Sequence, residues 1–316
     1  MHGILTKMAD IVENISQVII GKKVAAELML TALLCEGHVL VEDVPGVGKT
    51  SLVSAMARSV DSTFRRIQFT PDILPSDITG FSLFNQKTGD FEYRQGLVMS
   101  NFVLADEINR TSPKTQASLL EVMEESQVTV DGVSRPVGRP FMVMATQNPI
   151  DYVGTYPLPE AQMDRFFMKI RMGYPDPKEE ADILRRYRSA DLLRSLNPVA
   201  RAEEIIELQR LVREVYVDES LYDYTVDIVR RTRAHPDVVL GASPRGSLSL
   251  FRAAQAWALY RGRDYSYPDD IKEMAGPVLS HRIILRQEAR VRRVAQEDIV
   301  ADVLREAPAP VRRSRG

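Results

Sequence analysis

Short apolar segments alternate with helical patterns along the first half of the chain. Residues 24–36 place apolar side chains three and four positions apart, which predicts an amphipathic helix. Residues 38–41 follow as a short buried strand, and residues 102–105 and 141–145 have the same apolar character. Short buried strands that alternate with helices predict a parallel sheet covered by helices on both faces.

Two insertions interrupt this alternation. Residues 70–97 are rich in Gly, Pro, Asp and Phe, and residues 127–138 hold Asp131 and Gly132 between β-forming side chains. An Asp-Gly pair in that setting is typical of a hairpin turn. We therefore expect the first insertion to be less regular and the second to be a hairpin.

The second half of the chain reads as helices. A proline-rich segment, residues 174–177, ends the α/β pattern. Helices are predicted over residues 202–215, 221–235 and 247–261. We expect an α/β domain over residues 1–174 that carries both insertions, a small all-helical domain over residues 175–306, and a flexible tail over residues 307–316.

Composition narrows the class of protein. Hydrophobic residues make up 44% of the 316 residues, which is enough for a substantial core. Lys and Arg number 41 against 43 Asp and Glu, so a general attraction to nucleic acid is not expected, although a local basic patch stays open. The single cysteine, Cys35, is expected to be a buried thiol. Without a segment of ~20 apolar residues or a signal-peptide pattern at the N-terminus, we expect a cytoplasmic protein without membrane insertion.

A candidate phosphate-binding loop lies between the first predicted strand and a helix. It consists of Pro45, Gly46, Val47, Gly48, Lys49, Thr50 and Ser51. Small residues there let backbone N–H groups converge on an anion at the positive end of a helix. Lys49 is expected to reach the β- and γ-phosphates, and the Thr50 hydroxyl to bind Mg²⁺. The full motif has glycine where this chain has Asp43, and the alternative is an ordinary loop that starts a helix.

Polar side chains end the next two predicted strands. Asp106 and Glu107 follow residues 102–105, and Asn148 follows residues 141–145. In open α/β sheets the carboxyl ends of the strands carry the ligand site. Asp106 is expected to hold Mg²⁺, Glu107 to polarise the attacking water, and Asn148 to position that water. A solvated helix start and a turn asparagine are the alternatives.

Together these motifs resemble the AAA+ superfamily, and four segments resemble MoxR ATPases. The segments are residues 41–50, 104–110, 145–149 and 158–166. The resemblance implies a P-loop sheet between helices, followed by a helical lid. It also implies a ring, commonly a hexamer, with ATP and Mg²⁺ at each subunit boundary. In it Asp106 and Glu107 resemble Walker B, Asn148 resembles sensor 1, and Asp43 is similar to what the family often carries.

The same resemblance assigns residues outside the three motifs. Arg165 resembles the arginine finger that enters the neighbouring subunit's site, and Arg245 resembles sensor 2, which would touch the nucleotide from the lid. For Arg165 the alternative is a surface salt bridge to Asp164 or Glu160.

The resemblance also covers the adenine contact and the two insertions. Ile20 and Gly21 match the segment that contacts adenine in relatives, although Lys22 departs from the usual glutamine. The two insertions resemble the helix-2 and pre-sensor-1 inserts, which project toward the pore or partner face. Solvated loops are the alternative for both.

These patterns favour a catalytic ATPase that remodels or activates partner proteins. The family implies a partner with a von Willebrand factor A domain, and the client is unknown. A nucleic-acid motor is the second hypothesis, but the predicted hairpin carries Arg135 as its one basic residue. A magnesium-chelatase-type subunit and a nucleotide-binding scaffold without turnover are the others. The four histidines have no metal-ligand spacing, so no metal site of the protein's own is expected.

Overall fold

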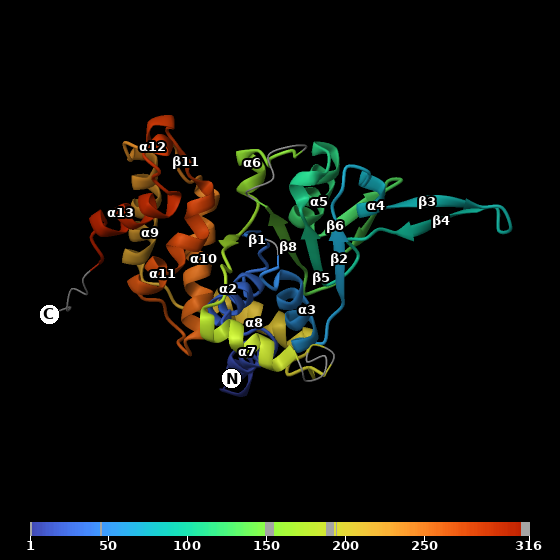
Figure 1. The fold of residues 1–316 in the computed structure, drawn as a ribbon, viewed down its shortest axis with the longest axis horizontal. Helices are drawn as coiled ribbons and strands as arrows, with labels where there is room; N and C mark the ends of the chain where they lie inside the picture. Colours follow the sequence, from blue (N-terminus) through green and yellow to red (C-terminus); the bar gives the residue numbers. More distant parts are fainter. Residues whose placement is uncertain (1, 45, 149–154, 188–192, 194, 311–316) are drawn as a thin grey trace.

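The computed structural model describes residues 2–44, 46–148, 155–187, 193 and 195–310. Figure 1 shows an α/β part, from blue to green, beside a helical part in orange and red. The centre of the α/β part is a five-stranded sheet in the order β2-β5-β8-β1-β9, and every neighbouring pair is parallel. The strands are β1 (Val39–Glu42), β2 (Phe64–Gln68), β5 (Phe102–Asp106), β8 (Met142–Gln147) and β9 (Met168–Ile170). The predicted parallel sheet is confirmed.

Successive side chains of each central strand enter two different hydrophobic clusters. Leu104 and Met144 belong to one cluster, whereas Val103 and Val143 belong to the other, and all four are fully buried. Because side chains alternate along a strand, the two clusters lie on opposite faces of the sheet. Both faces are therefore covered, as an apolar parallel sheet requires.

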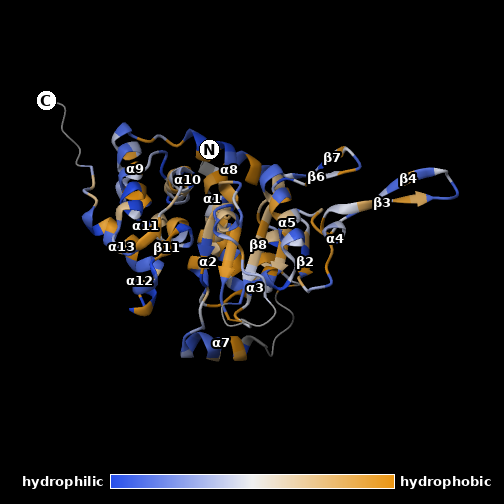
Figure 2. Cartoon of the chain, turned by 90° about the horizontal axis from the view of Figure 1, so that it is seen from above, coloured by the Kyte–Doolittle hydropathy of each residue, from blue (hydrophilic) through white to orange (hydrophobic). Residues whose placement is uncertain are grey.

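Seven helices accompany the sheet within the described residues up to Tyr187. They are α1 (His2–Val18), α2 (Lys23–Leu34), α3 (Lys49–Ser59), α4 (Pro75–Thr79), α5 (Pro113–Glu125), α6 (Glu160–Met163) and α7 (Pro177–Tyr187), with a 3₁₀ turn at Ile108–Arg110. Met8 of α1, Leu33 of α2 and Val53 of α3 enter the first cluster, and Leu119 of α5 enters the second. Figure 2 shows α7 at the lower edge, apart from the other helices.

Two antiparallel hairpins project from the α/β part on the same side (Figure 2). The longer one, β3 (Gly80–Asn85) with β4 (Asp90–Gln95), follows α4, so the first insertion is more regular than the sequence predicts. The shorter one joins β6 (Gln127–Val130) to β7 (Val133–Pro136). Its turn residues Asp131 and Gly132 both have positive φ, of 52° and 75°, as a type I′ turn demands. The predicted second hairpin is confirmed.

The helical part contains the three predicted helices and three more. They are α8 (Ala202–Glu214), α9 (Glu219–Ala234), α10 (Pro244–Tyr260), α11 (Pro268–Leu279), α12 (Gln287–Val291) and α13 (Gln296–Glu306), with a 3₁₀ turn at Ser280–Arg282. A two-stranded antiparallel sheet, β10 (Val238–Leu240) with β11 (Ile284–Leu285), is added to the all-helical unit that the sequence predicts. No helix among the described residues is long and apolar enough to span a membrane.

The two parts share one hydrophobic core. The first cluster continues from α1 and α2 into α8 and α10. At the junction, Gln209 Nε2 of α8 donates to the Leu33 carbonyl at 2.8 Å. Cys35 is buried there as predicted, and its thiol donates to the Arg252 carbonyl at 3.3 Å. The helical part is therefore packed onto the sheet domain through its helices rather than linked to it by a free hinge.

Candidate functional site

A pocket of about 370 Å³ lies at the carboxyl ends of β1, β5 and β8. It is lined by Asp43, Gly46, Gly48, Lys49, Thr50, Ser51, Arg66, Gln68, Asp106, Glu107, Thr146 and Asn148. We call it the loop pocket. The structure thus brings the predicted loop, the two acids and the asparagine together at one rim of the sheet.

The loop before α3 depends on two glycines. Gly46 and Gly48 have φ values of 86° and 92°, which lie in the left-handed region that residues with a Cβ rarely adopt. Gly48 is the residue before the first turn of α3, so the free N–H groups of that turn begin at the pocket. Val47 points into the hydrophobic core, whereas Pro45 lies outside the described residues. The loop therefore offers the pocket backbone donors and the side chains of its last three residues.

Asp43, which replaces the glycine of the full motif, fastens the loop to the segment after β9. Its Oδ2 accepts the backbone N–H groups of Met172 at 2.5 Å and Gly173 at 2.7 Å, and its Oδ1 accepts that of Val44 at 3.1 Å. Its carbonyl accepts a hydrogen bond from Lys49 Nζ at 2.9 Å. The Asp43 side chain thus ties the loop to the segment after β9, and its carbonyl holds the ammonium group of Lys49 at the pocket.

Charges in the loop pocket oppose one another. Burial lowers the pKa of Lys49, and the carboxylates of Asp106, Asp43 and Glu107 act in the opposite direction. Lys49 thus lies among three acids whose charges offset part of the effect of burial. An anion bound next to Lys49 would add to this attraction and favour the charged ammonium further.

Thr146 connects the two acids that end β5. Its Oγ1 donates to Asp106 Oδ1 at 2.7 Å and accepts the backbone N–H of Glu107 at 2.9 Å. Glu107 has a φ of 57°, a left-handed conformation that is costly for a residue with a Cβ. The bond from its N–H to Thr146 helps to hold this conformation, which turns the Glu107 side chain away from the strand direction.

Each acid also contacts side chains that the sequence patterns did not single out. Asp106 Oδ2 accepts two hydrogen bonds from Arg66, from Nη2 at 2.6 Å and from Nε at 3.2 Å. Glu107 Oε2 accepts one from Gln68 Nε2 and one from Arg110 Nη1, both at 2.9 Å. Arg66 Nη2 donates in turn to Gln68 Oε1 at 2.8 Å. Arg66 and Gln68 are two positions apart on β2 and therefore lie on the same face of this edge strand. Most residues of β2 are exposed, so the sequence has no apolar run there that would predict a strand.

The donors of the loop pocket fit a magnesium ion that shares its ligands with a nucleotide. Mg²⁺ is commonly held by one or two carboxylates together with substrate phosphates. Asp106 and the Thr50 hydroxyl supply such a partial set in one pocket. Across the described part of the chain, no group of three or more His, Cys, Asp and Glu side chains is arranged to hold a metal by itself.

Arg165 and Arg245 lie together in a second pocket, of about 310 Å³, that does not include Lys49. We call it the arginine pocket. The carboxylate of Glu124, at the end of α5, bridges them: Oε2 lies 3.3 Å from Arg165 Nε and Oε1 lies 2.7 Å from Arg245 Nη2. The partner of Arg165 is therefore Glu124 rather than Asp164 or Glu160. Arg245 is grouped with Arg165 and not with the loop that precedes α3.

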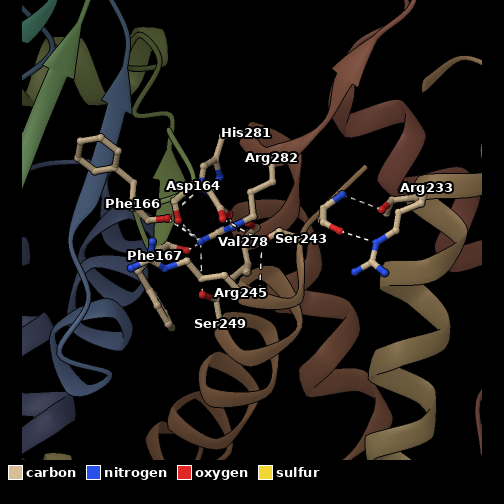
Figure 3. Close-up of polar contacts among 12 residues, drawn as sticks. Asp164, Phe166, Phe167, Arg233, Ser243, Arg245, Ser249, Val278, His281 and Arg282 are labelled. Carbon is tan, nitrogen blue, oxygen red and sulfur yellow. Dashed lines mark hydrogen bonds and ion pairs between the residues drawn. The ribbon is translucent and has the colours of Figure 1, made fainter. Parts of the chain in front are cut away.

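Asp164, beside Arg165, is bound to the helical part (Figure 3). Its Oδ1 accepts from Arg282 Nε at 2.7 Å, and its Oδ2 accepts from the Ser243 hydroxyl at 2.8 Å. Arg282 also donates to the Phe166 carbonyl at 2.7 Å. Burial lowers the pKa of Arg282 to about 10, and Asp164 opposes that shift. This ion pair, of which Arg282 is buried, positions the Arg165 backbone next to the start of α10, where Arg245 lies.

Ile20 and Gly21 are not among the residues that line the loop pocket. Gly21 has a φ of 73°, and the carboxyl group of Glu179 occupies the space where a Cβ would lie. Lys22 Nζ donates to the Tyr174 carbonyl at 3.1 Å. The segment before α7 thus covers the turn at Ile20 and Gly21. This turn lies beside α7 rather than at the loop pocket.

Comparison with known proteins assigns the fold to a family. Residues 38–168 match the ATPase family associated with various cellular activities (AAA), and residues 230–303 match the AAA lid domain. Chaperone MoxR1 of Mycobacterium tuberculosis (strain ATCC 25618 / H37Rv) is 43% identical over 306 residues, which cover 94% of this chain and 81% of that protein. The chain belongs to the MoxR family of AAA ATPases.

Two further relatives extend the match over nearly the whole chain. The Bacillus subtilis (strain 168) protein YeaC is 54% identical over 314 residues, which cover 99% of this chain and 97% of that protein. A solved structure from Cytophaga hutchinsonii ATCC 33406, described as a candidate ATPase, superimposes with a TM-score of 0.91 at 39% identity and covers 98% of this chain and 96% of that one. The chain is thus a MoxR-type ATPase with a lid domain after its sheet domain.

Proposed function

We propose that this MoxR-type ATPase binds MgATP in the loop pocket, hydrolyses it to ADP and phosphate within a cytoplasmic ring, and uses the energy to remodel partner proteins. The observation that carries the proposal is that Lys49 and Glu107 line the same pocket. A phosphate-binding cation and a water-orienting acid must share one triphosphate for in-line transfer. Their separation on different faces would have excluded this chemistry.

The roles within the pocket follow from the contacts of each residue. Backbone N–H groups at the start of α3 and Lys49 would hold the phosphates, and Asp106 with Thr50 would hold Mg²⁺, which supplies charge neutralisation of the phosphate oxygens. Glu107 would accept a proton from the attacking water, and Asn148 would orient that water. Thr146 would keep both acids in place from the neighbouring strand.

The arginine pocket supports action between subunits. Arg165 and Arg245 are held together by Glu124, outside the loop pocket of their own chain. Guanidinium groups suit the stabilisation of phosphoryl charge because they are always charged and can bind two oxygens. We propose that the pair enters the loop pocket of the adjacent subunit, which a hexameric ring would provide, so that Arg245 acts across the boundary together with Arg165. Ile20 and Gly21 keep the proposed adenine contact, which would require movement of the segment before α7.

The hairpins support a protein partner rather than nucleic acid. The β3–β4 hairpin exposes Phe81, Phe84 and Phe91, an apolar surface typical of protein contact. On the β6–β7 hairpin, the Arg135 guanidinium lies 4.0 Å from the centre of the Tyr93 ring, so this cation packs against the protein. A partner with a von Willebrand factor A domain is the candidate that the family provides, and the client is unassigned.

Hydrolysis by purified protein and two variants tests the proposal. Wild-type protein should release phosphate from ATP and form larger oligomers with ATP in light-scattering measurements. Glu107→Gln should bind ATP but hydrolyse it about 100-fold more slowly, because the water loses its proton acceptor. Lys49→Ala should lose nucleotide binding itself. Unchanged turnover by Glu107→Gln would refute the role of that acid, and an inactive wild type that does not bind ATP would refute the function.

A further inference from the structure

Arg66 holds the carboxylate that is proposed to bind magnesium. Both of its hydrogen bonds to Asp106 end on one oxygen, Oδ2, while Oδ1 accepts from Thr146. The Asp106 side chain is only 15% exposed, whereas that of Arg66 is 49% exposed at the mouth of the loop pocket. A half-exposed cation thus covers an acid that is mostly buried and held by hydrogen bonds.

Arg66 and a metal ion compete for Asp106 Oδ2. A carboxylate oxygen has two lone pairs, and both of those on Oδ2 accept N–H groups of Arg66. Two cations close together at this oxygen would also repel each other. Oδ1 is not a ready substitute, because its bond to Thr146 also orders the backbone of Glu107. Direct coordination of Mg²⁺ by Oδ2 therefore requires Arg66 to leave.

We propose that Arg66 and Mg²⁺ are alternative partners of Asp106, and that Arg66 transfers to a phosphate oxygen of ATP when the metal arrives with its nucleotide. This inference rests on the proposed function of the loop pocket. The transfer keeps the guanidinium paired throughout, since ATP brings phosphate oxygens into the pocket that Arg66 lines. No covalent bond changes in this step. Arg66 would hinder binding of the metal when ATP is absent and would allow it when ATP is bound.

The neighbouring residue on β2 provides a matched control. Arg65 carries the same charge on the other face of the strand, and its Nη1 donates to the Gly96 carbonyl at 3.2 Å rather than to an acid of the pocket. Arg65→Ala removes one positive charge from the same strand without exposing Asp106. A comparison of Arg66→Ala with Arg65→Ala thus separates release of the carboxylate from a general change in charge.

Binding of Mn²⁺ to the nucleotide-free protein, followed by electron paramagnetic resonance of the free ion, tests the proposal without any turnover. Arg66→Ala should bind Mn²⁺ about fivefold more tightly than wild type, as expected for removal of one half-exposed ion pair. Arg65→Ala should match wild type. Equal Mn²⁺ affinity in all three proteins, with unchanged circular dichroism, would overturn the proposal and leave Arg66 as a static surface salt bridge.

ATP binding provides the second measurement. The dissociation constant for ATP with Mg²⁺ should rise in Arg66→Ala, since one phosphate contact is lost, and should recover in part in Arg66→Lys, which keeps the charge but not the forked geometry. An ATP affinity of Arg66→Ala equal to that of wild type would contradict the transfer. If wild type itself failed to bind ATP, the proposed function would fail; if wild type bound and hydrolysed ATP while Arg66→Ala behaved as Arg65→Ala, only this inference would fail.

Discussion

Thr146 of β8 and Asp106 of β5 are joined across the sheet by a 2.7 Å hydrogen bond in which the hydroxyl is the donor. Thr146 is 1% exposed, and its oxygen also accepts the N–H of Glu107. One buried hydroxyl therefore fixes a carboxylate and the backbone of the residue next to it. The relative position of Asp106 and Glu107, for which we propose different tasks in ATP hydrolysis, thus depends on a side chain from another strand.

Replacement of that hydroxyl should damage both activity and stability. Thr146→Val keeps the shape of the side chain but leaves the Glu107 N–H and one Asp106 oxygen without this partner, which costs about 1–3 kcal/mol of unfolding free energy. Misplacement of the acids should lower the rate of phosphate release by about 10- to 100-fold. Urea unfolding and a phosphate-release assay measure the two effects, and Thr146→Ser should restore both. A Thr146→Val variant with the wild-type rate would show that the hydroxyl does not position the acids.

Mixing of inactive variants tests whether the arginine pocket acts on a neighbour. Arg165→Ala and Lys49→Ala should each be inactive alone, because every subunit boundary of the proposed ring then lacks either Arg165 or the lysine proposed to bind phosphate. In mixed rings, an intact loop pocket from an Arg165→Ala subunit can face an intact Arg165 from a Lys49→Ala subunit, so activity should return in part. The Arg245→Ala variant should behave in the same way. Mixed oligomers that form but stay inactive would argue for action within one chain.

Much of the sheet could be predicted because its central strands are short and uniformly apolar. The edge strands could not: β2 presents Arg65 and Arg66 in sequence, and β9 has only three residues around Lys169. Lys169 is nevertheless buried, since Glu42 of β1 lies 3.1 Å from its Nζ and neutralises it. A pattern that counts apolar residues misses strands whose charges are paired across the fold.

The residues of the candidate site also differ in how well the sequence predicts them. Lys49, Thr50, Asp106 and Glu107 belong to local motifs, so the sequence placed them in one pocket, whereas the Glu124 bridge between Arg165 and Arg245 is a long-range contact that no local spacing reveals. The domain limit near residue 174 stays a prediction, because a continuous core joins the helices before and after it.

Acid should destabilise the protein through His38. This ring is buried between β8 and α5: its Nδ1 accepts the Val143 N–H at 3.0 Å and its Nε2 contacts the Met123 carbonyl at 2.8 Å. Burial lowers the pKa of His38 to about 4, although the bond to Met123 opposes the shift. The unfolded chain, with a histidine pKa of about 6.5, therefore binds a proton first as the pH falls. The stability due to the neutral ring is complete above pH ~6.5 and is lost between about 6.5 and 4.

Urea unfolding at two pH values measures this effect. Between pH 7.5 and 5.0 the contribution of His38 to the unfolding free energy should fall by about 2 kcal/mol. A His38→Gln variant, which cannot be protonated at that position, should show a correspondingly smaller difference between the two pH values, with the remaining slope due to groups such as His281, whose pKa burial also lowers. Identical slopes for wild type and variant would rule out His38 as the source.

The aromatic residues of the β3–β4 hairpin should matter for partner proteins but not for the fold. Phe84 and Phe91 are 50% and 73% exposed, with ring centres 5.3 Å apart, so they contribute little to the core. Phe91→Ser should change the unfolding free energy by no more than about 0.5 kcal/mol and leave basal hydrolysis of ATP intact. Because an exposed apolar hairpin suits contact with unfolded protein, the variant should lose stimulation of ATP hydrolysis by casein, whereas Val291→Ser, on α12 at 78% exposure, should retain it. Equal stimulation of Phe91→Ser and wild type by casein would show that the hairpin does not take part in client binding.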